Sequence, residues 1–506
     1  FSPATKPGIV KKNDKLELGV KLPKSINFQI NNYVNNKPLS KLNPFNPEDI
    51  NIQAVFYKKE NDKWVRVKNR FGFYYKNYIR NTNDLDPDDW FWQNKQTDYN
   101  FRIRFTPQEI GEWKCEISSF TKNSSSIKIT EFQFKCISSN KKGFVKVSEN
   151  NFKNLSLDEE GFFPIGLNLT KPTCYVELDK NKKVISDPYQ CSEKNIDCAG
   201  IEDWCGRKKV GINTLLIYQK ELEKLKKSGA NYFRFLNMPH TYAIEYEKLG
   251  NYYDRMNRAW ELDDLISKTE KLGLKMQYCI SYGNEFRDPA VYSMVNWDWN
   301  AGPLKEDNGN CYKNELNLKS NVEFLTDSIA KKYYKNRLRY IVSRWGYSTG
   351  IGVIELQNEI NGQFPNSDVG RYQWQDEMAS YIKNDLESNH LVAVSYAGNP
   401  KKHIIKGDDS YSSPWVDVIT FNYYNRPNYR KILKEQIDEY SNYKKPFLYA
   451  EIGISDDLAH CDNNIEWIKD IWITPFIGSA GMGLNWHEQH NYELWENYSL
   501  VQSFLS

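Results

Sequence analysis

The chain has 506 residues, 40% of them apolar and 26% charged, and this length exceeds what one compact core usually holds, so we expect two domains. Its net charge of +3 argues against a nucleic-acid-binding protein, because such proteins usually carry a concentrated basic patch. No stretch reaches the roughly 18 apolar residues of a membrane-spanning helix. Aromatic residues make up 15% of the chain, which favours a carbohydrate partner, although large domains also use aromatic residues in their cores.

The first 142 residues contain two kinds of segment. Residues 1–24 are polar and rich in lysine, which predicts a partly ordered arm. From residue 25 to residue 142, apolar and polar residues alternate over short runs such as 51–57 and 99–105, and turn residues separate these runs. Alternation of this kind is typical of antiparallel strands with one buried face. We therefore expect an all-β immunoglobulin-like sandwich over residues 25–142.

The pattern changes after the turn at Asn140–Gly143. Short apolar runs now alternate with longer amphipathic stretches. The runs predicted as strands are 162–168, 230–236, 275–280, 353–356, 391–395, 416–421, 446–451 and 482–486. The clearest helices are expected at 218–228, 262–272, 321–345 and 373–387. Eight strands that alternate with helices predict an α/β fold, a (β/α)8 TIM barrel over residues 143–506, with the sandwich preceding it.

Two of the predicted strands lead into a carboxylate. The apolar run Val353–Leu356 is followed by Asn358 and Glu359, and the run that starts at Pro446 ends on Glu451. In TIM barrels the carboxyl ends of the strands carry the catalytic groups. Two carboxyl groups in one cleft are also the minimum requirement for cleaving a glycosidic bond. We therefore expect Glu359 and Glu451 to converge on one site.

These motifs resemble those of the retaining glycoside hydrolases of clan A, which include glycoside hydrolase family 5. The stretch Ile354–Glu359 is similar to the strand-four motif of that clan, and Leu448–Glu451 is similar to the strand-seven motif. The resemblance implies that Glu359 is the acid/base, that Glu451 is the nucleophile and that Asn358 contacts the sugar 2-hydroxyl.

Further positions match the same clan. Arg234 resembles the arginine that positions the nucleophile, and Tyr424 the tyrosine that bonds to it. Asn422 stands where many members have histidine, and Trp486 resembles the strand-eight tryptophan under the substrate. The stretch Phe105–Trp113 resembles a sandwich module that often precedes these barrels. The resemblance thus implies that Arg234, Tyr424, Asn422 and Trp486 all face the substrate.

Several other residues are candidates for the same cleft. His240 follows the second predicted strand and Trp299 lies in the loop after the third, where each lines the cleft or simply packs in its loop. Asn168 ends the first strand, and Glu355 and Glu488 are reserve carboxylates. Glu355 shares strand parity with Glu359, so it is also a candidate for a deeper inward-facing residue.

Metal binding is not expected. His487 and His490 are three residues apart, whereas a zinc-protease helix places its two histidines four residues apart. The cysteines offer neither CxxC pairs nor a histidine at zinc-finger spacing. We therefore expect no metal and no cofactor.

The nine cysteines indicate disulfides and hence a secreted or extracytoplasmic protein. Four of them, Cys174, Cys191, Cys198 and Cys205, fall in one polar stretch and are expected to pair among themselves. The two pairs expected elsewhere are Cys115–Cys136 and Cys311–Cys461. Cys279 lies inside an apolar strand and is expected to be a free, buried thiol.

The join between the two predicted domains is short. It lies at Gly143 and is too short for a free linker, so we expect the sandwich to be docked on the barrel. The aromatic residues of Phe71–Tyr75 and Trp90–Trp92 would then be buried in the contact, whereas an independent binding module would expose them.

The proposed chemistry assigns different protonation states to the two carboxyl groups. A retaining glycosidase needs an ionised nucleophile and a protonated acid about 5 Å apart. Arg234 and the Tyr424 hydroxyl are expected to favour ionised Glu451, which leaves the proton on Glu359. The sequence therefore predicts a secreted retaining β-glycoside hydrolase that cleaves a β-linked oligo- or polysaccharide by double displacement. A catalytically silent carbohydrate-binding barrel and a transglycosylase with the same residues are the alternatives.

Overall fold

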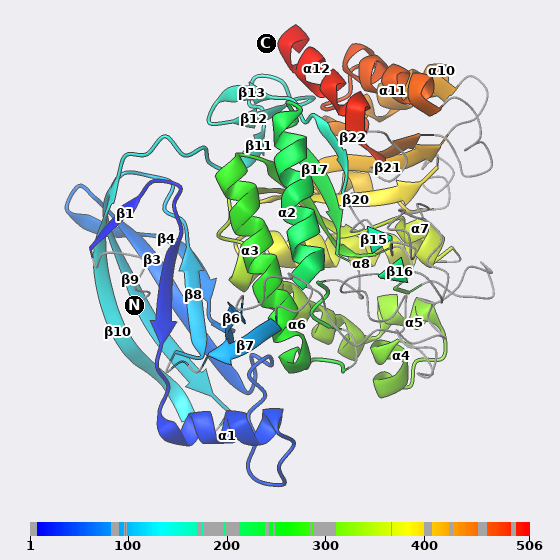
Figure 1. Ribbon diagram of the computed structural model, residues 1–506. Helices are drawn as coiled ribbons and strands as arrows, with labels where there is room; N and C mark the ends of the chain where they lie inside the picture. The colour runs from blue at the N-terminus through cyan, green and yellow to red at the C-terminus, as the bar shows by residue number, and fades with distance from the viewer. Residues whose placement is uncertain are drawn as a thin grey trace, which may run out of the picture.

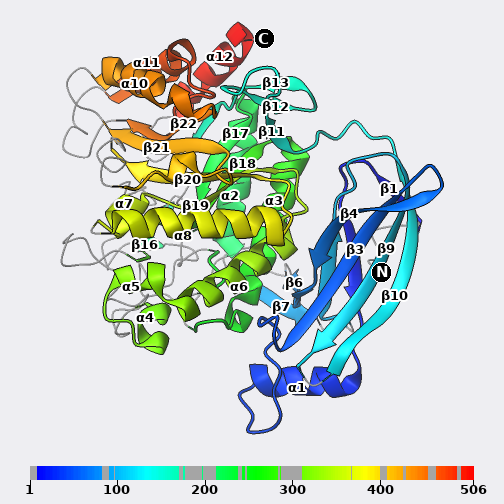
Figure 2. The ribbon, with the colours of Figure 1, turned by 180° about the vertical axis from the view of Figure 1, so that it is seen from behind.

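The structure is a computed structural model of the whole chain. It describes residues 8–81, 91–95, 97, 99–122, 124–169, 175–176, 196–197, 212–237, 242–245, 248–282, 285–286, 310–365, 367–398, 407–424, 429–453, 463–486 and 492–505. Among the candidates above, His240, Trp299, Glu488 and the cysteines at 174, 191, 198, 205 and 461 lie outside these ranges. The chain forms a mixed α/β fold with several sheets (Figures 1 and 2).

The N-terminal part is built from antiparallel sheets with one parallel edge strand. Its strands are β1 (Ile9–Lys11), β2 (Leu16–Val20), β3 (Ile50–Glu60), β4 (Lys63–Phe71), β5 (Phe73–Tyr74), β6 (Asn77–Asn81), β7 (Phe91–Lys95), β8 (Phe101–Phe105), β9 (Gly111–Thr121) and β10 (Ser124–Ile137). They form a five-stranded sheet in the order β1-β10-β9-β3-β4, a three-stranded sheet β2-β8-β5 and the pair β6-β7. Helix α1 (Lys24–Val34) lies between β2 and β3 in the chain.

The two larger N-terminal sheets face each other. Phe56 of β3 stacks on Phe105 of β8 with ring centroids 3.9 Å apart, and Trp113 of β9 packs on the same phenylalanine. Residues 9–20, assigned above to an arm, belong to these sheets, because β1 pairs with β10 and β2 pairs with β8. The alternating burial of β2 shows why: Leu16, Leu18 and Val20 are buried while the residues between them are half-exposed.

The predicted disulfide between Cys115 and Cys136 is wrong. Both thiols are free and buried. In the β9–β10 register Cys115 lies opposite Phe132, whereas Cys136 lies opposite Gly111, four residues farther along. At about 3.4 Å per residue this offset is roughly 14 Å, beyond the ~7 Å that a disulfide tolerates between Cα atoms.

The two remaining cysteines of the described part are also free and buried. Cys311 carries no disulfide, so the expected pair with Cys461 is wrong as well. Cys279 is a free, buried thiol in its strand, as predicted.

The C-terminal part is built around eight parallel strands in the order β22-β21-β20-β19-β18-β17-β14-β23. The bounds are β14 (Gly166–Asn168), β17 (Tyr232–Leu236), β18 (Lys275–Ser281), β19 (Ile351–Gln357), β20 (Leu391–Ala397), β21 (Val418–Tyr424), β22 (Phe447–Gly453) and β23 (Asn485–Trp486). Backbone hydrogen bonds from Ile452 to Leu484 and from Leu484 to Tyr449 join β22 to the residues just before β23. The sheet therefore closes on itself, and the carboxyl ends of its strands form one rim.

Helices cover the outside of this sheet (Figures 1 and 2). They are α2 (Ile212–Lys227), α3 (Met256–Leu272), α4 (Cys311–Leu316), α5 (Asn321–Thr326), α6 (Ser328–Trp345), α7 (Ile360–Gln363), α8 (Asp368–Ser380), α10 (Tyr429–Tyr440), α11 (Asn463–Ile477) and α12 (Asn497–Leu505). A π-helical turn, Tyr381–Asp385, extends α8, and short 3-10 turns lie at Tyr253–Arg255, Ser410–Ser412, Ser441–Tyr443 and Tyr492–Glu496.

The single helix predicted over 321–345 is two helices. Asp327 has extended backbone dihedrals, and its side chain accepts a hydrogen bond from the amide of Ala330. A carboxylate in this position caps the first turn of a helix. Asp327 therefore ends α5 and begins α6.

A small sheet closes the amino end of the eight-stranded sheet. Its strands are β11 (Val145–Val147), β12 (Leu155–Leu157) and β13 (Glu160–Phe162). Val145 and Leu155 are buried in one cluster with residues from the amino ends of the parallel strands, including Val353 and Val418. A polar site inside the sheet is therefore expected at the opposite, carboxyl-end rim. A further two-stranded sheet pairs β15 (Tyr175–Val176) with β16 (Ile196–Asp197).

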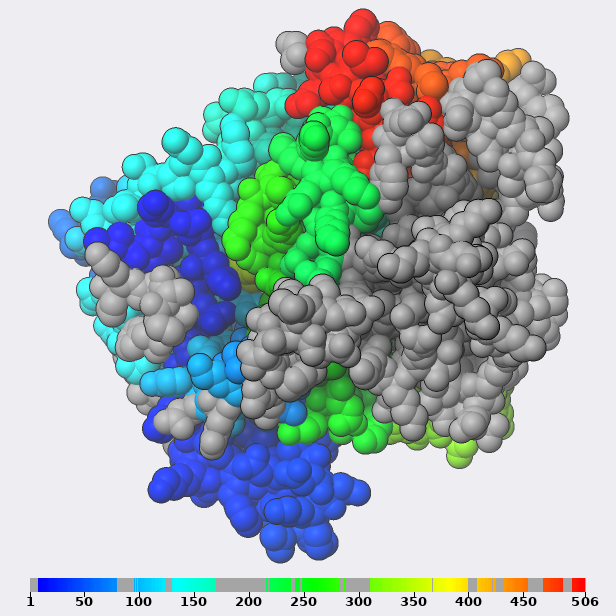
Figure 3. Space-filling model, in the orientation of Figure 1, coloured from blue at the N-terminus to red at the C-terminus, as the bar shows by residue number. Residues whose placement is uncertain are grey.

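The N-terminal sheets are docked on the helices of the C-terminal part, and Figure 3 shows the blue and cyan segments adjoining the green ones. Phe73 and Tyr74 are buried, and the Tyr340 hydroxyl of α6 donates to the Tyr74 carbonyl at 2.9 Å. Phe45 packs on Tyr252 and Tyr340, so one apolar cluster continues across the contact. The expected docking is confirmed for this stretch.

An ion-pair network with Asp263 of α3 at its centre joins the two parts. Its carboxylate accepts from Arg104 of β8 at 2.7 and 3.2 Å and from Arg344 of α6 at 2.7 and 3.1 Å. The indole N–H of Trp345 donates to it at 2.8 Å. Burial alone would raise the pKa of Asp263, but Arg104 and Arg344 hold it well below its ordinary value.

Replacing Asp263 by alanine is expected to destabilise the protein by about 3–5 kcal/mol, because the buried Arg344 loses its carboxylate partner and the buried Arg104 keeps only Glu17. The measurement is the shift of the urea unfolding midpoint. Glu223→Ala is the matched control, since Glu223 pairs with Lys268 on the surface with its side chain 56% exposed, and an exposed pair contributes less than about 1 kcal/mol. Equal midpoints for the two variants would contradict the role given to Asp263.

Candidate functional site

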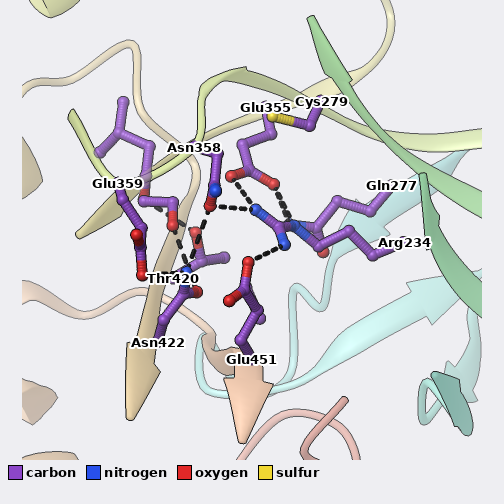
Figure 4. Close-up of polar contacts among 12 residues, drawn as sticks. Arg234, Gln277, Cys279, Glu355, Asn358, Glu359, Thr420, Asn422 and Glu451 are labelled. Carbon is purple, nitrogen blue, oxygen red and sulfur yellow. Dashed lines mark hydrogen bonds and ion pairs between the residues drawn. The ribbon is translucent and has the colours of Figure 1, made fainter. Parts of the chain in front are cut away.

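Polar side chains from several strands meet at the carboxyl-end rim, and Figure 4 shows Arg234, Asn358, Glu359, Asn422 and Glu451 pointing toward one another. The strands are all parallel, so their last residues project into one space. The residues are Asn168 of β14, Arg234 of β17, Asn358 and Glu359 directly after β19, Asn422 and Tyr424 of β21, and Glu451 of β22. Six of them were predicted to share one site, and Asn168 was named as a further candidate.

Arg234 lies at the centre of this group. Its side chain is fully buried. The Nη1 atom donates to Glu451 Oε1 at 2.7 Å and to Asn168 Oδ1 at 3.1 Å. The Nη2 atom donates to Asn358 Oδ1 at 2.8 Å, so one guanidinium connects β14, β17, β22 and the end of β19. The predicted contact between Arg234 and Glu451 is present.

Glu451 is buried, with 2% of its surface exposed. Its second oxygen accepts a hydrogen bond from the Tyr424 hydroxyl, the partner expected from the sequence. The pKa of Glu451 is raised to about 7, and burial is the largest cause. Arg234 and the Tyr424 hydrogen bond lower this pKa, whereas the Glu359 carboxylate raises it further. Arg234 and Tyr424 do lower the pKa of Glu451, as the sequence predicted, but burial raises it by more. The prediction that these two partners keep Glu451 ionised therefore needs correction.

Glu359 sits on a strained backbone. Its φ angle is +46°, in the left-handed region that a non-glycine residue rarely adopts, and it precedes the first turn of α7. Asn422 Nδ2 donates to Glu359 Oε1 at 2.9 Å and to Asn358 Oδ1 at 3.2 Å. Asn422, in the place where clan members often have histidine, therefore connects both residues of the strand-four motif.

Glu355 and Gln277 form a buried layer beneath the rim. Glu355, held in reserve above, pairs with Arg234 through both oxygens at 2.6 Å. Gln277 of β18 donates to Glu355 Oε2 at 2.7 Å. Sequence reasoning missed Gln277, although a polar residue within the apolar run 275–280 is the signal that would have identified it.

The remaining candidates are only partly described. The backbone of Trp486 pairs with Asn168 at the end of β23, which places this residue at the rim, but its side chain lies outside the described part. His240 and Trp299 lie outside the described residues altogether. Their roles stay predictions. In the part of the chain that is described, no group of three or more metal-binding side chains comes together.

Comparison with known proteins finds relatives that are mannan endo-1,4-β-mannosidases. The chain is 30% identical over 160 residues to mannan endo-1,4-β-mannosidase 5 of Solanum lycopersicum, which covers 29% of this chain and 34% of that protein. It is 26% identical over 234 residues to mannan endo-1,4-β-mannosidase F of Aspergillus fumigatus, covering 41% of this chain and 46% of that protein. The chain thus spans between a third and a half of the length of these curated relatives. No family model matches it.

Among solved structures, the chain resembles a protein from Bacteroides vulgatus that is described as a candidate glycoside hydrolase. The match has a TM-score of 0.57 at 15% identity and covers 98% of this chain and 78% of that one, which shows a shared fold. Together with the mannanase relatives, it supports the resemblance to clan A glycoside hydrolases that the motifs indicate.

Proposed function

We propose that the protein is a retaining β-glycoside hydrolase with Glu451 as nucleophile and Glu359 as acid/base. The observation that carries the proposal is the pair of carboxylates at one rim, one bonded to Arg234 and Tyr424 and the other to Asn422. The closed parallel sheet with its outer helices supports a (β/α)8 barrel over residues 143–506, and the facing N-terminal sheets support an immunoglobulin-like sandwich over 25–142.

In the first step, a carboxylate oxygen of Glu451 attacks the anomeric carbon. The bond from this carbon to the glycosidic oxygen breaks, and the leaving oxygen takes the proton of Glu359. The products are a glycosyl ester on Glu451 and a free sugar hydroxyl. Arg234 and Tyr424 hold the carboxylate of Glu451 in place for this attack.

In the second step, Glu359, now ionised, takes a proton from water. The water oxygen attacks the anomeric carbon, and the ester bond to Glu451 breaks, which restores both carboxyl groups. Asn358 uses its Oδ1 atom to accept from Arg234 and Asn422. Its Nδ2 donor is thereby left for the sugar 2-hydroxyl, the contact that the clan motif implies.

We propose a β-1,4-linked mannan as the substrate. The support is the name of the curated relatives, several of which are mannan endo-1,4-β-mannosidases from plants and fungi. A substrate of this kind is a long polysaccharide, so it needs a site that is open along the rim.

The test is incubation of the purified protein with carob galactomannan and with 1,4-β-mannopentaose, followed by proton NMR of the first products. The β-anomer at early times supports retention, whereas the α-anomer means inversion and contradicts the two-step mechanism. Cellulose and xylan in parallel test the substrate. Sugar binding without turnover would favour the silent barrel, and longer oligosaccharides as the main products would favour the transglycosylase.

We also propose that the protein is secreted, on the evidence of the four clustered cysteines between 174 and 205. Alkylation of the unreduced, denatured protein is expected to modify five of its nine cysteines, because the proposal pairs the four clustered ones and 9 − 4 = 5. Mass spectrometry of the peptides should find Cys115, Cys136, Cys279 and Cys311 among the modified ones, since these thiols are free. Modification of all nine would remove the support for secretion.

A further inference from the structure

The guanidinium of Arg234 has five N–H donors, and the structure gives each of them an acceptor. Nε and one Nη2 hydrogen go to the two oxygens of Glu355, both at 2.6 Å. The second Nη2 hydrogen goes to Asn358, and the two Nη1 hydrogens go to Asn168 and Glu451. The two-point contact with Glu355 fixes the plane of the guanidinium, which leaves one N–H for Glu451.

Glu355 is itself held firmly. Neither Glu355 nor Arg234 is exposed to solvent. Gln277 donates to Glu355 Oε2 at 2.7 Å, and the Tyr232 hydroxyl in turn donates to Gln277 Oε1 at 2.9 Å. The Cys279 thiol lies beside the same carboxylate (Figure 4). Glu355 thus lies below the rim, where it acts on the reaction only through Arg234.

We propose that Glu355 is a positioning residue: it holds Arg234 in one orientation and balances its charge, so that Glu451 receives a single N–H bond instead of a complete ion pair. This inference rests on the proposed role of Glu451 as nucleophile. A carboxylate that is fully paired with an arginine is less basic and therefore a weaker nucleophile. Glu355 keeps Arg234 from pairing with Glu451 in that way.

Among the described residues, the charged and titratable groups around the two carboxylates come from four strands. Glu451 faces Arg234, Glu359 and the Tyr424 hydroxyl. Glu355 faces Arg234 and lies near the Cys279 thiol and the Tyr232 hydroxyl. Removal of the Glu355 charge leaves Arg234 as an uncompensated cation beside Glu451. The pKa of Glu451, which burial raises to about 7, must then fall.

The test is Glu355→Gln, with kcat and KM on mannopentaose measured from acid to neutral pH. In the native protein, kcat/KM should fall as the pH drops below about 7, because protonated Glu451 cannot attack. In the variant this acid limb should move to lower pH by about one unit or more. kcat on the plateau should fall about 10- to 100-fold with little change in KM, because Arg234 is displaced and Glu355 does not touch the substrate.

Glu355→Asp is the matched control, because it keeps the charge and shifts its position. Its acid limb should stay at the native pH while kcat falls, so this variant tests the proposal even if Glu355→Gln does not fold. An acid limb that stays in place in Glu355→Gln, or one that moves equally in both variants, overturns the proposal. So does an unchanged kcat in Glu355→Asp.

A measurement without substrate separates this inference from the proposed function. Infrared difference titration follows the protonated carboxyl of Glu451, with Glu451→Ala to assign its band. A lower pKa of Glu451 in Glu355→Gln supports the inference even if mannan proves not to be the substrate, and an unchanged pKa overturns it. A native protein that titrates as expected but cleaves no glycoside contradicts the proposed function alone.

Discussion

Replacement of Glu451 by alanine is expected to lower kcat roughly a millionfold, the size of effect that removal of a covalent nucleophile produces. Neither of the two described carboxylates nearby is placed to replace it, because Glu355 is paired with Arg234 below the rim and Glu359 accepts a hydrogen bond from Asn422. The measurement is turnover of a 2,4-dinitrophenyl β-glycoside, whose leaving group needs no proton. Added azide should restore part of the activity and give the α-glycosyl azide, because azide then attacks the substrate directly from the face that Glu451 occupied.

Glu223→Ala, on the outer helix α2, is the control for effects of purification and folding, and it should keep native turnover. Glu451→Gln adds a variant of nearly the same shape. The assignment of Glu451 as nucleophile would be wrong if Glu451→Gln retained more than about 1% of native turnover, since an amide cannot form the ester.

Replacement of Glu359 by alanine is expected to act on the two steps differently. With mannopentaose, whose leaving group needs a proton, kcat should fall about 10²- to 10⁴-fold. With a 2,4-dinitrophenyl glycoside the first step should stay fast, so that the glycosyl-enzyme accumulates. The measurement is a burst of dinitrophenol followed by slow turnover.

Azide should accelerate that slow phase and give the β-glycosyl azide, because it attacks the ester on Glu451 from the side that water uses. The configuration of the azide product therefore distinguishes the two residues: α for Glu451→Ala and β for Glu359→Ala. The same configuration from both variants would contradict the division of roles. An inverting enzyme would show no burst with either variant, since it forms no covalent intermediate.

Much of the site was accessible from the sequence because its signals are local. A short apolar run followed by a polar residue marks the end of a buried strand, and this pattern located Glu359 and Glu451. The expected contacts of Glu451 with Arg234 and Tyr424 are present in the structure. The resemblance to clan A implied these two contacts, and the ends of parallel strands bring such residues together because they meet at one rim.

Other predictions from the sequence were wrong because they depended on the register and pairing of segments in space. A local sequence pattern does not specify these. Cys115 and Cys136 lie on neighbouring strands as predicted, but the register separates them by four positions. The helix expected over 321–345 is interrupted because the Asp327 side chain caps α6. Residues 9–11 and 16–20 form strands because they pair with β10 and β8, respectively.

By itself, the sequence determined the order of strands and helices, the carboxylates at two strand ends and the resemblance to clan A, because these follow from periodicity and residue type along the chain. Only the tertiary structure decided that Glu355, 121 positions from Arg234, shares its guanidinium with Glu451. It also decided that burial carries the pKa of Glu451 to about 7 despite its two favourable partners. The physical reason is that desolvation and charge–charge interaction depend on distances in space, and closure of the sheet sets those distances between residues far apart in the chain.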